Sequence, residues 1–175
     1  MTGNDTKFYA QYQPLHIVLL ALGHIVHAPW LVNPLCAALT LPVAYALAAR
    51  IFGKRTARLT LLLMLFSPFI LFMSSEYMNH ASALLCAALF MLCYVIMDQS
   101  QQSGQPRTAR RAAAGAGLAI GALCLVRPFS ALGLVLPFAF HALCRLYKAP
   151  RQYFAPLCFM GVTLAFCLGI ALWYN

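Results

Sequence analysis

Seven apolar stretches, separated by short polar or basic segments, make up most of the chain. Their bounds are Leu15–Ala28, Leu31–Ile51, Ala57–Met73, Ala81–Met97, Ala112–Val126, Ala131–Leu146 and Tyr153–Tyr174. A helix that crosses a bilayer needs about 20 apolar residues, within a usual range of about 17–25. The second and seventh stretches meet this length, and flanking Ser, Arg and Lys side chains that reach the headgroups extend the third to sixth. The pattern therefore predicts six membrane-spanning helices.

The first stretch differs from the others, because it has 14 residues, carries three histidines and ends just before Pro29. We expect a juxtamembrane or partly inserted helix over residues 15–28, following residues 1–14, which end an external loop. Residues 31–175 then form one domain. The predicted fold class is all-α, a polytopic membrane helical bundle with about six transmembrane helices plus one short interfacial helix. A spanning first stretch would instead put the N-terminus in the cytoplasm, and the charges leave that alternative open.

The composition supports a membrane protein. Of the 175 residues, 63% are hydrophobic and 9% are charged, and the mean hydropathy is +0.79. Soluble domains have about 25% charged residues, so a soluble fold of this composition would expose mostly apolar surface and aggregate. Intrinsic disorder is excluded as well, because it requires low hydrophobicity.

The charges indicate the topology. The chain has 12 Lys and Arg residues against 3 Asp and Glu residues, a net charge of +9. Ten of the basic residues fall in alternate loops: Arg50, Lys54, Arg55, Arg58, Arg107, Arg110, Arg111, Arg145, Lys148 and Arg151. By the positive-inside rule these loops are cytoplasmic, which places both termini outside. Such juxtamembrane clusters attract anionic lipid headgroups, so we do not expect nucleic acid as a partner.

An outside N-terminus normally follows an upstream hydrophobic segment, and residues 1–14 contain no signal peptide. We therefore expect the chain to be a fragment of a longer membrane protein, or the product of a late start codon. Within it, Gly117 and Gly121 are four residues apart and predict close packing against another helix. The seven cysteines all lie in apolar stretches without a C-x-x-C motif, so they predict neither disulfides nor a zinc site.

The segment Ser74–His80 is the first candidate functional site, in a predicted outer loop. Glu76 and His80 are four residues apart, so they share a helix face if the fourth spanning helix starts early. A carboxylate and an imidazole there could bind a divalent cation, orient an acceptor hydroxyl or hydrogen-bond each other. The alternative is a plain polar turn between two helices.

Arg127-Pro128 is the second candidate, because it interrupts a long apolar run on the predicted outer side. The planar guanidinium of arginine matches the oxygens of a phosphate group. The alternative is an ordinary arginine that reaches the lipid headgroups.

Several segments, in this order, resemble the region after the first external loop of bacterial GT-C glycosyltransferases. The segments are Phe8–His16, Ala28–Leu35, Ala48–Arg55, Ser67–Ser74, Tyr77–His80, Gly117–Gly121, Val126–Pro128 and Tyr174-Asn175. The resemblance is to the polyprenyl-phosphate-sugar-dependent enzymes, family 39-like, that include protein O-mannosyltransferases and aminoarabinose transferases. It implies a bacterial inner (plasma) membrane protein that lacks its first helix and C-terminal part.

The resemblance also implies site residues. The basic residue of a Thr-Arg/Lys-Pro/Gly pattern falls on Arg127, although Val126 replaces the threonine, and this basic residue would hold the donor phosphate. The implied substrate-binding residues are Arg127, Glu76, His80, Asn79 and Tyr12, and Glu76 and His80 are also candidates for a divalent metal ion. The family's general base lies in a loop that would precede Met1, because Asp5 is too close to Tyr12. No catalytic residue is therefore expected in this chain.

The leading hypothesis is a fragment of a membrane glycosyltransferase that uses a polyprenyl-phosphate-linked sugar donor in the outer leaflet. One alternative is a small lipid-binding or transporter-like protein, although only His141 is ionisable near mid-span, which argues against ion coupling. Another is a helper subunit that completes an active site with a partner membrane chain.

Overall fold

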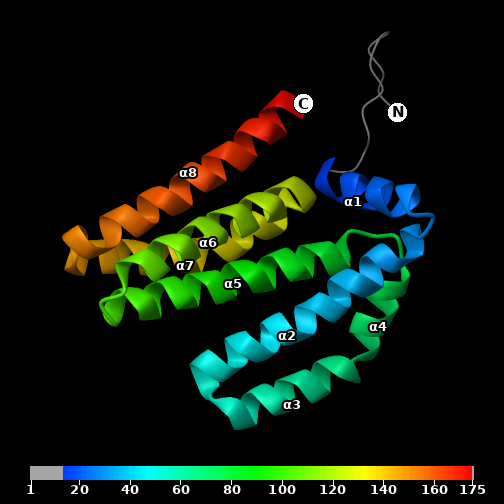
Figure 1. Cartoon of the computed structure of the whole chain (residues 1–175), viewed down its shortest axis with the longest axis horizontal. Coiled ribbons are helices and arrows are strands. Elements are labelled where there is room, and N and C mark those ends of the chain that lie inside the picture. Colours follow the sequence, from blue (N-terminus) through cyan, green and yellow to red (C-terminus); the bar gives the residue numbers. More distant parts are fainter. Residues whose placement is uncertain (1–13, 175) are drawn as a thin grey trace.

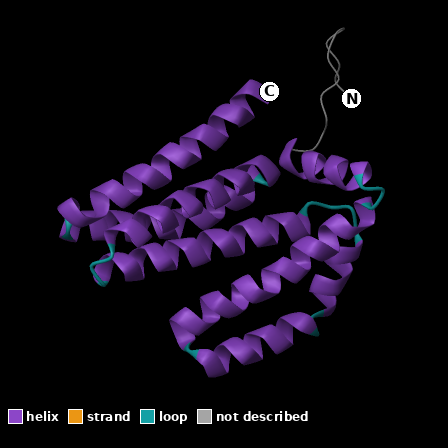
Figure 2. Ribbon diagram, viewed as in Figure 1, coloured by secondary structure: helices purple, strands orange, loops and turns teal. Residues whose placement is uncertain are grey.

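The computed structural model describes residues 14–174, and every regular element among them is a helix (Figures 1 and 2). The elements are α1 Pro14–Ile25, the 3-10 turn η1 Pro29–Leu31, α2 Val32–Phe52, α3 Lys54–Leu65, α4 Pro68–Ser75, α5 His80–Gln102, α6 Pro106–Val126, α7 Pro128–Lys148 and α8 Pro150–Tyr174. The all-α prediction is confirmed for the described residues.

Five helical segments are long and apolar enough to cross a membrane: Pro29–Phe52, His80–Gln102, Pro106–Val126, Pro128–Lys148 and Pro150–Trp173. A sixth arises if α3 and α4, which are bent by 53° relative to each other, together form one broken span. The described chain thus has five to six candidate spans, in agreement with the predicted polytopic bundle.

The third apolar stretch departs from the prediction of one continuous helix. It is interrupted at Phe66 and Ser67, and Ser67 has an extended backbone with φ −72° and ψ 114°. The physical cause is Pro68, which has no backbone N–H to donate and disfavours the helical conformation in the residue before it. The predicted span Ala57–Met73 therefore becomes two helices with a bend between them.

Helix α1 is the short apolar helix expected over residues 15–28, and it ends at Ile25. The turn that follows uses a left-handed residue, His27 with φ 55°. Gly23 lets α1 approach η1 and α2 closely, because an added Cβ would lie 2.7 Å from Cγ2 of Val32 and 2.9 Å from Cα of Pro29. Helix α1 packs beside α6 and η1 at one end of the bundle (Figure 1).

Helix α6 is the centre of the packing and contacts both α5 and α8 (Figure 1). Its buried residues are mostly small, which allows close approach. A Cβ on Gly117 would overlap Thr163 and the carbonyl of Met160 on α8, and a Cβ on Gly121 would overlap Cys167. The predicted packing role of these two glycines is confirmed.

The helices alternate in direction, so the turns gather at two ends (Figure 1). One end holds the α2–α3, α5–α6 and α7–α8 turns together with the ten basic residues that the sequence groups in alternate loops, and we call it the basic end. The opposite end, which we call the α1 end, holds α1, the α4–α5 turn and the α6–α7 turn. The two candidate segments around Glu76 and Arg127 therefore lie at the same end.

Candidate functional site

Residues 76–79 form the α4–α5 turn, and a buried amide holds their backbone in place. Asn33, at the start of α2, is 3% exposed. Its Nδ2 donates hydrogen bonds to the carbonyl oxygens of Glu76 and Met78, the latter at 2.8 Å. One side chain of α2 thus fixes two positions of the turn.

A buried histidine holds the same turn from the side of α1. His16 is 4% exposed, and its Nε2 lies 2.9 Å from the carbonyl oxygen of Tyr77. Because a carbonyl only accepts hydrogen bonds, Nε2 carries the hydrogen. Nδ1 of His16 lies 3.0 Å from Oγ of Ser82 on α5. His16 therefore ties the turn to the first helical turn of α5.

Arg127 is the single residue between α6 and α7. Its N–H donates to the carbonyl of Leu123 at 2.7 Å, and its carbonyl accepts from the N–H of Ala131 at 3.0 Å. The neighbouring carbonyl of Val126 accepts from Nδ2 of Asn79 at 2.9 Å. These bonds lock the backbone of Arg127 between two helices and join it to the α4–α5 turn.

The guanidinium of Arg127 pairs with a histidine. Nη1 donates to Nδ1 of His80, the first residue of α5, at 2.7 Å. Since Nδ1 accepts this bond, the hydrogen of the neutral imidazole is on Nε2, where it remains available to another acceptor. Among residues 14–174 no carboxylate forms an ion pair with Arg127. Its positive charge is therefore not neutralised by the described part of the chain.

Arg127 and His80 line an apolar cavity of about 340 Å³. The other lining residues come from α2, α4, α5, α6 and α7, and Ser130 is the only polar one: Ala37, Phe69, Ile70, Met73, Ala81, Ala83, Leu84, Ala87, Leu123, Ser130 and Leu134. The site thus combines an unneutralised cation with an apolar hollow, an arrangement suited to an anionic headgroup that carries a hydrocarbon chain.

A second cavity of about 650 Å³ lies between α1 and the α4–α5 turn. It is lined by His16, Ile17, Leu20, Glu76, Tyr77, Met78 and Asn79. Asn79 lines this cavity and the next residue, His80, lines the first. The two cavities at the α1 end are therefore lined by consecutive residues of the chain.

The structure brings three predicted site residues together, Arg127, His80 and Asn79. Glu76 and His80 would share a helix face only if α5 started early, and this condition is not met, because α5 begins at His80. Glu76 follows α4 in extended conformation, with φ −90° and ψ 155°, so the two side chains are not one helical turn apart. In residues 14–174 there is no group of three or more His, Cys, Asp and Glu side chains that could hold a metal ion. Tyr12 lies outside the described residues.

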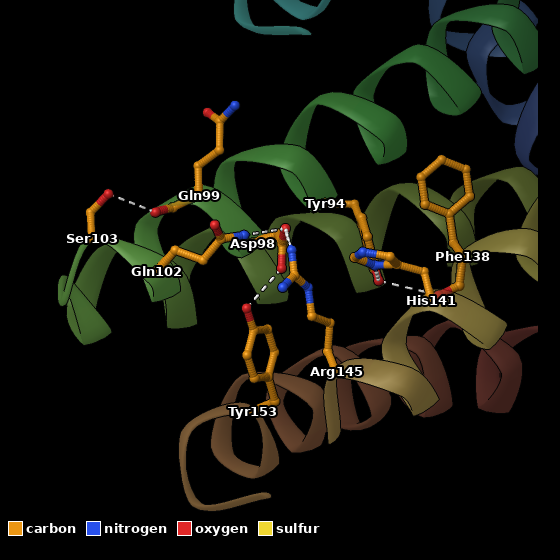
Figure 3. A network of polar contacts seen from close by, with 9 residues as sticks. All are labelled: Tyr94, Asp98, Gln99, Gln102, Ser103, Phe138, His141, Arg145 and Tyr153. Atoms are coloured by element: carbon orange, nitrogen blue, oxygen red, sulfur yellow. Dashed lines mark hydrogen bonds and ion pairs between the residues drawn. The ribbon is translucent and has the colours of Figure 1, made fainter. Parts of the chain in front are cut away.

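Sequence reasoning missed a polar network at the basic end (Figure 3). Asp98 of α5 accepts hydrogen bonds from Nη2 of Arg145 at 2.9 Å, from the Tyr153 hydroxyl at 2.8 Å and from Nε2 of Gln102 at 2.7 Å. The Arg145–Asp98 contact is also an ion pair. The side chains of three helices, α5, α7 and α8, meet on this one carboxylate.

A second polar contact between α5 and α7 lies one helical turn further into the bundle. The Tyr94 hydroxyl lies 2.8 Å from Nδ1 of His141 and 3.2 Å from the carbonyl of Phe138 (Figure 3). Tyr94 and Asp98 are four residues apart on α5, as are His141 and Arg145 on α7. This matched spacing is the signal in the sequence that could have revealed the network. It lies at the other end of the bundle from Arg127.

Comparison with known proteins identifies the family. The sequence profile of the Alg9-like mannosyltransferase family matches residues 7–174, almost the whole chain. No curated protein and no solved structure matches the chain. The match supports the predicted class, a membrane glycosyltransferase, but names a different family from the O-mannosyltransferases and aminoarabinose transferases of the resemblance. The chain belongs to the Alg9-like mannosyltransferase family.

Proposed function

We propose that this chain is part of a membrane glycosyltransferase of GT-C type that transfers a sugar from a polyprenyl-phosphate donor to an acceptor outside the membrane. The family description favours mannose as the sugar. In this proposal Arg127 binds the donor phosphate, and the apolar cavity that Arg127 lines receives the first part of the polyprenyl chain.

The observation that carries the proposal is the position of Arg127 on the 340 Å³ apolar cavity, without a carboxylate partner among the described residues. A guanidinium in such a site binds phosphate oxygens through charge-assisted hydrogen bonds. An adjacent carboxylate would compete with the phosphate for the same hydrogens. The apolar walls would favour a hydrocarbon chain over water.

His80 supports this role of Arg127. It accepts one hydrogen bond from the guanidinium, which restricts the rotation of a long side chain. Its Nε2–H is a second neutral donor for a phosphate oxygen. Arg127 has several other N–H groups that remain for the ligand.

The chemistry requires stabilisation of a leaving phosphate. An acceptor hydroxyl attacks the anomeric carbon of the sugar, the bond from that carbon to the phosphate oxygen breaks, and negative charge grows on the phosphate. Fixed donors aimed at that charge lower the barrier. The proton of the acceptor hydroxyl passes to a general base.

The proposed orientation follows from the charges. The positive-inside rule places the basic end in the cytoplasm, and the α1 end then faces outward. In a bacterial inner membrane this puts Arg127 and the cavity at the level of the outer leaflet. The donor lipid would reach the site from that leaflet.

A binding measurement in nanodiscs tests the proposal, with polyprenyl-phosphate mannose as the ligand. We expect Arg127→Gln to weaken binding by about 10-fold or more, since a hydrogen bond to a charged group contributes about 1.5–3 kcal/mol. Arg127→Lys should weaken it less. The matched control is Arg151→Gln, which removes an exposed arginine at the basic end. Equal donor affinity of Arg127→Gln and wild type would disprove the assignment.

A further inference from the structure

Asn79 occupies the position just before α5, yet its side chain does not serve that helix. At this N-cap position an asparagine normally accepts a hydrogen bond from an N–H group of the first helical turn. Within residues 14–174 the Asn79 side chain forms no such bond to α5. Its Nδ2 instead donates to the carbonyl of Val126, the last residue of α6, at 2.9 Å. A local contribution to α5 is thus replaced by a contact with another helix.

The carbonyl of Val126 needs a partner because α6 ends there. Arg127 leaves the helical conformation, with φ −151° and ψ 87°, so a further turn of α6 does not supply an N–H group. Val126 is 1% exposed, which leaves little access for water. Asn79 satisfies this carbonyl and thereby fixes the end of α6, from which Arg127 emerges.

The residue after Asn79 holds the other end of Arg127. Nδ1 of His80 accepts a hydrogen bond from Nη1 of the guanidinium at 2.7 Å. Two consecutive residues therefore contact Arg127 at two places, the peptide group that joins it to Val126 and the end of its side chain. Because Asn79 and His80 are joined by a peptide bond, the contact of Asn79 with Val126 limits how far His80 and Arg127 can separate.

The turn that carries Asn79 is itself anchored by two buried polar side chains. Asn33 of α2 and His16 of α1 are 3% and 4% exposed, and they bond to the carbonyls of residues 76–78. Polar side chains inside membrane proteins are energetically costly and are found mainly where they serve a function. These contacts form a continuous support from α1 and α2 to Arg127.

We infer that Asn79 is a positioning residue for Arg127, because it holds the end of α6 against the α4–α5 turn and so keeps the guanidinium on His80 before a ligand binds. This role differs from the substrate contact that the resemblance implies for Asn79, since its donor nitrogen is used within the protein. A side chain that is ordered in advance loses less conformational entropy on binding. The benefit for phosphate binding rests on the proposed function, whereas the placement of Arg127 by Asn79 does not.

Nitrogen-15 NMR of the histidine side chains, in ligand-free protein in nanodiscs, tests the placement directly. The chain has five histidines, and the His80 signal is the one that is lost in His80→Gln. Arg127→Ala gives the Nδ1 resonance of His80 without its hydrogen bond. We expect Asn79→Ala to shift the wild-type resonance toward that position.

Asn79→Ser is a second variant that protects the fold. Serine is a favourable N-cap residue for α5, but its hydroxyl oxygen is one bond closer to the backbone than the amide nitrogen of Asn79 and cannot reach the carbonyl of Val126. It should shift the His80 resonance in the same direction as Asn79→Ala.

The affinity for polyprenyl-phosphate mannose tests the consequence for binding. Asn79→Ala should weaken it by about 2-fold to 10-fold, the range expected when one long side chain must be ordered on binding. The matched control is Gly117→Ala, which disturbs the contact of α6 with α8 instead. It should lower stability and leave both the His80 resonance and the donor affinity unchanged, so it separates positioning from a general loss of stability.

The outcomes separate this inference from the proposed function. A wild-type His80 resonance in Asn79→Ala and Asn79→Ser would overturn the inference, as would equal shifts in Asn79→Ala and Gly117→Ala. Weakened donor binding by Arg127→Gln but not by Asn79→Ala would overturn the part of Asn79 in binding. A shifted His80 resonance in Asn79→Ala, with unchanged donor affinity in Arg127→Gln, would remove the donor site and keep Asn79 as the residue that places Arg127.

Discussion

Asn33 is a buried amide whose donor nitrogen serves two carbonyls of one turn. In Asn33→Asp the side chain keeps its shape but becomes acceptor-only, so carboxylate oxygens would face those carbonyls. A buried neutral group without a hydrogen-bond partner costs about 1–3 kcal/mol. We expect Asn33→Asp to lower the free energy of unfolding in detergent by more than this amount. Asn33→Ala should cost less, and the exposed Gln105→Ala almost nothing. Unfolding midpoints equal for Asn33→Asp and Gln105→Ala would contradict this role.

The candidate residues were predictable to different degrees. Arg127 stands out in the sequence because it interrupts an apolar run and precedes a proline. The pairing of Arg127 with His80 is not visible in the sequence, because the two residues are 47 positions apart and meet only through the packing of α5 and α6. The expected pairing of Glu76 and His80 failed for a local reason, since it depended on where one helix starts.

The contact between α6 and α8 depends on the absence of side chains at Gly117 and Gly121. We expect Gly117→Ala to lower the free energy of unfolding by about 1–3 kcal/mol, because its methyl group would overlap Thr163 and the backbone of Met160. Gly133→Ala on α7 is the matched control, because an added Cβ there meets open space. It should be neutral or raise stability, by at most about 1 kcal/mol from helix propensity. Thermal unfolding of both variants in one detergent is the measurement, and equal destabilisation would argue against the close contact.

Asp98 and Arg145 connect α5 to α7 where the side chains are largely withdrawn from solvent, at 16% and 34% exposure. A double-mutant cycle with Asp98→Asn and Arg145→Gln should give a coupling energy in the range of about 0.5–3 kcal/mol for residues in contact. The same cycle with the exposed Arg151→Gln should give a coupling near zero. Chemical unfolding in detergent supplies the four stabilities of each cycle. Equal coupling energies in the two cycles would mean that the Asp98–Arg145 ion pair does not contribute specifically to stability.

At the level of elements, the apolar pattern predicted nearly all helices because each span must satisfy its backbone hydrogen bonds internally. It missed the break at Ser67, although Pro68 was visible, because the composition on both sides of the break is equally apolar. It also missed the Asp98 network. Charge counting assigned Arg145 to a cytoplasmic loop, whereas helix packing turned it toward Asp98 of α5.

The whole-molecule arrangement predicts that Ser75 and Gln105 lie on opposite sides of the membrane. In a background with the exposed Cys144 and Cys158 replaced by alanine, Ser75→Cys should react with a membrane-impermeant maleimide on intact cells. Gln105→Cys should react only after the cells are permeabilised, because it lies beside the basic end. Labelling of both cysteines from the same side would contradict the topology.

Helices α6, α7 and α8 follow one another with a single residue in each turn, Arg127 and Ala149. Each helical residue rotates the chain by about 100°, so one inserted residue beside Arg127 would turn all of α7 and move His141 and Arg145 away from α5. The α5–α6 turn is different, with three residues and open space around Gly104. Evolution can therefore change the length of this protein at residues 103–105 but not at Arg127 or Ala149, and alignments of its homologues should have gaps only at the first of these places.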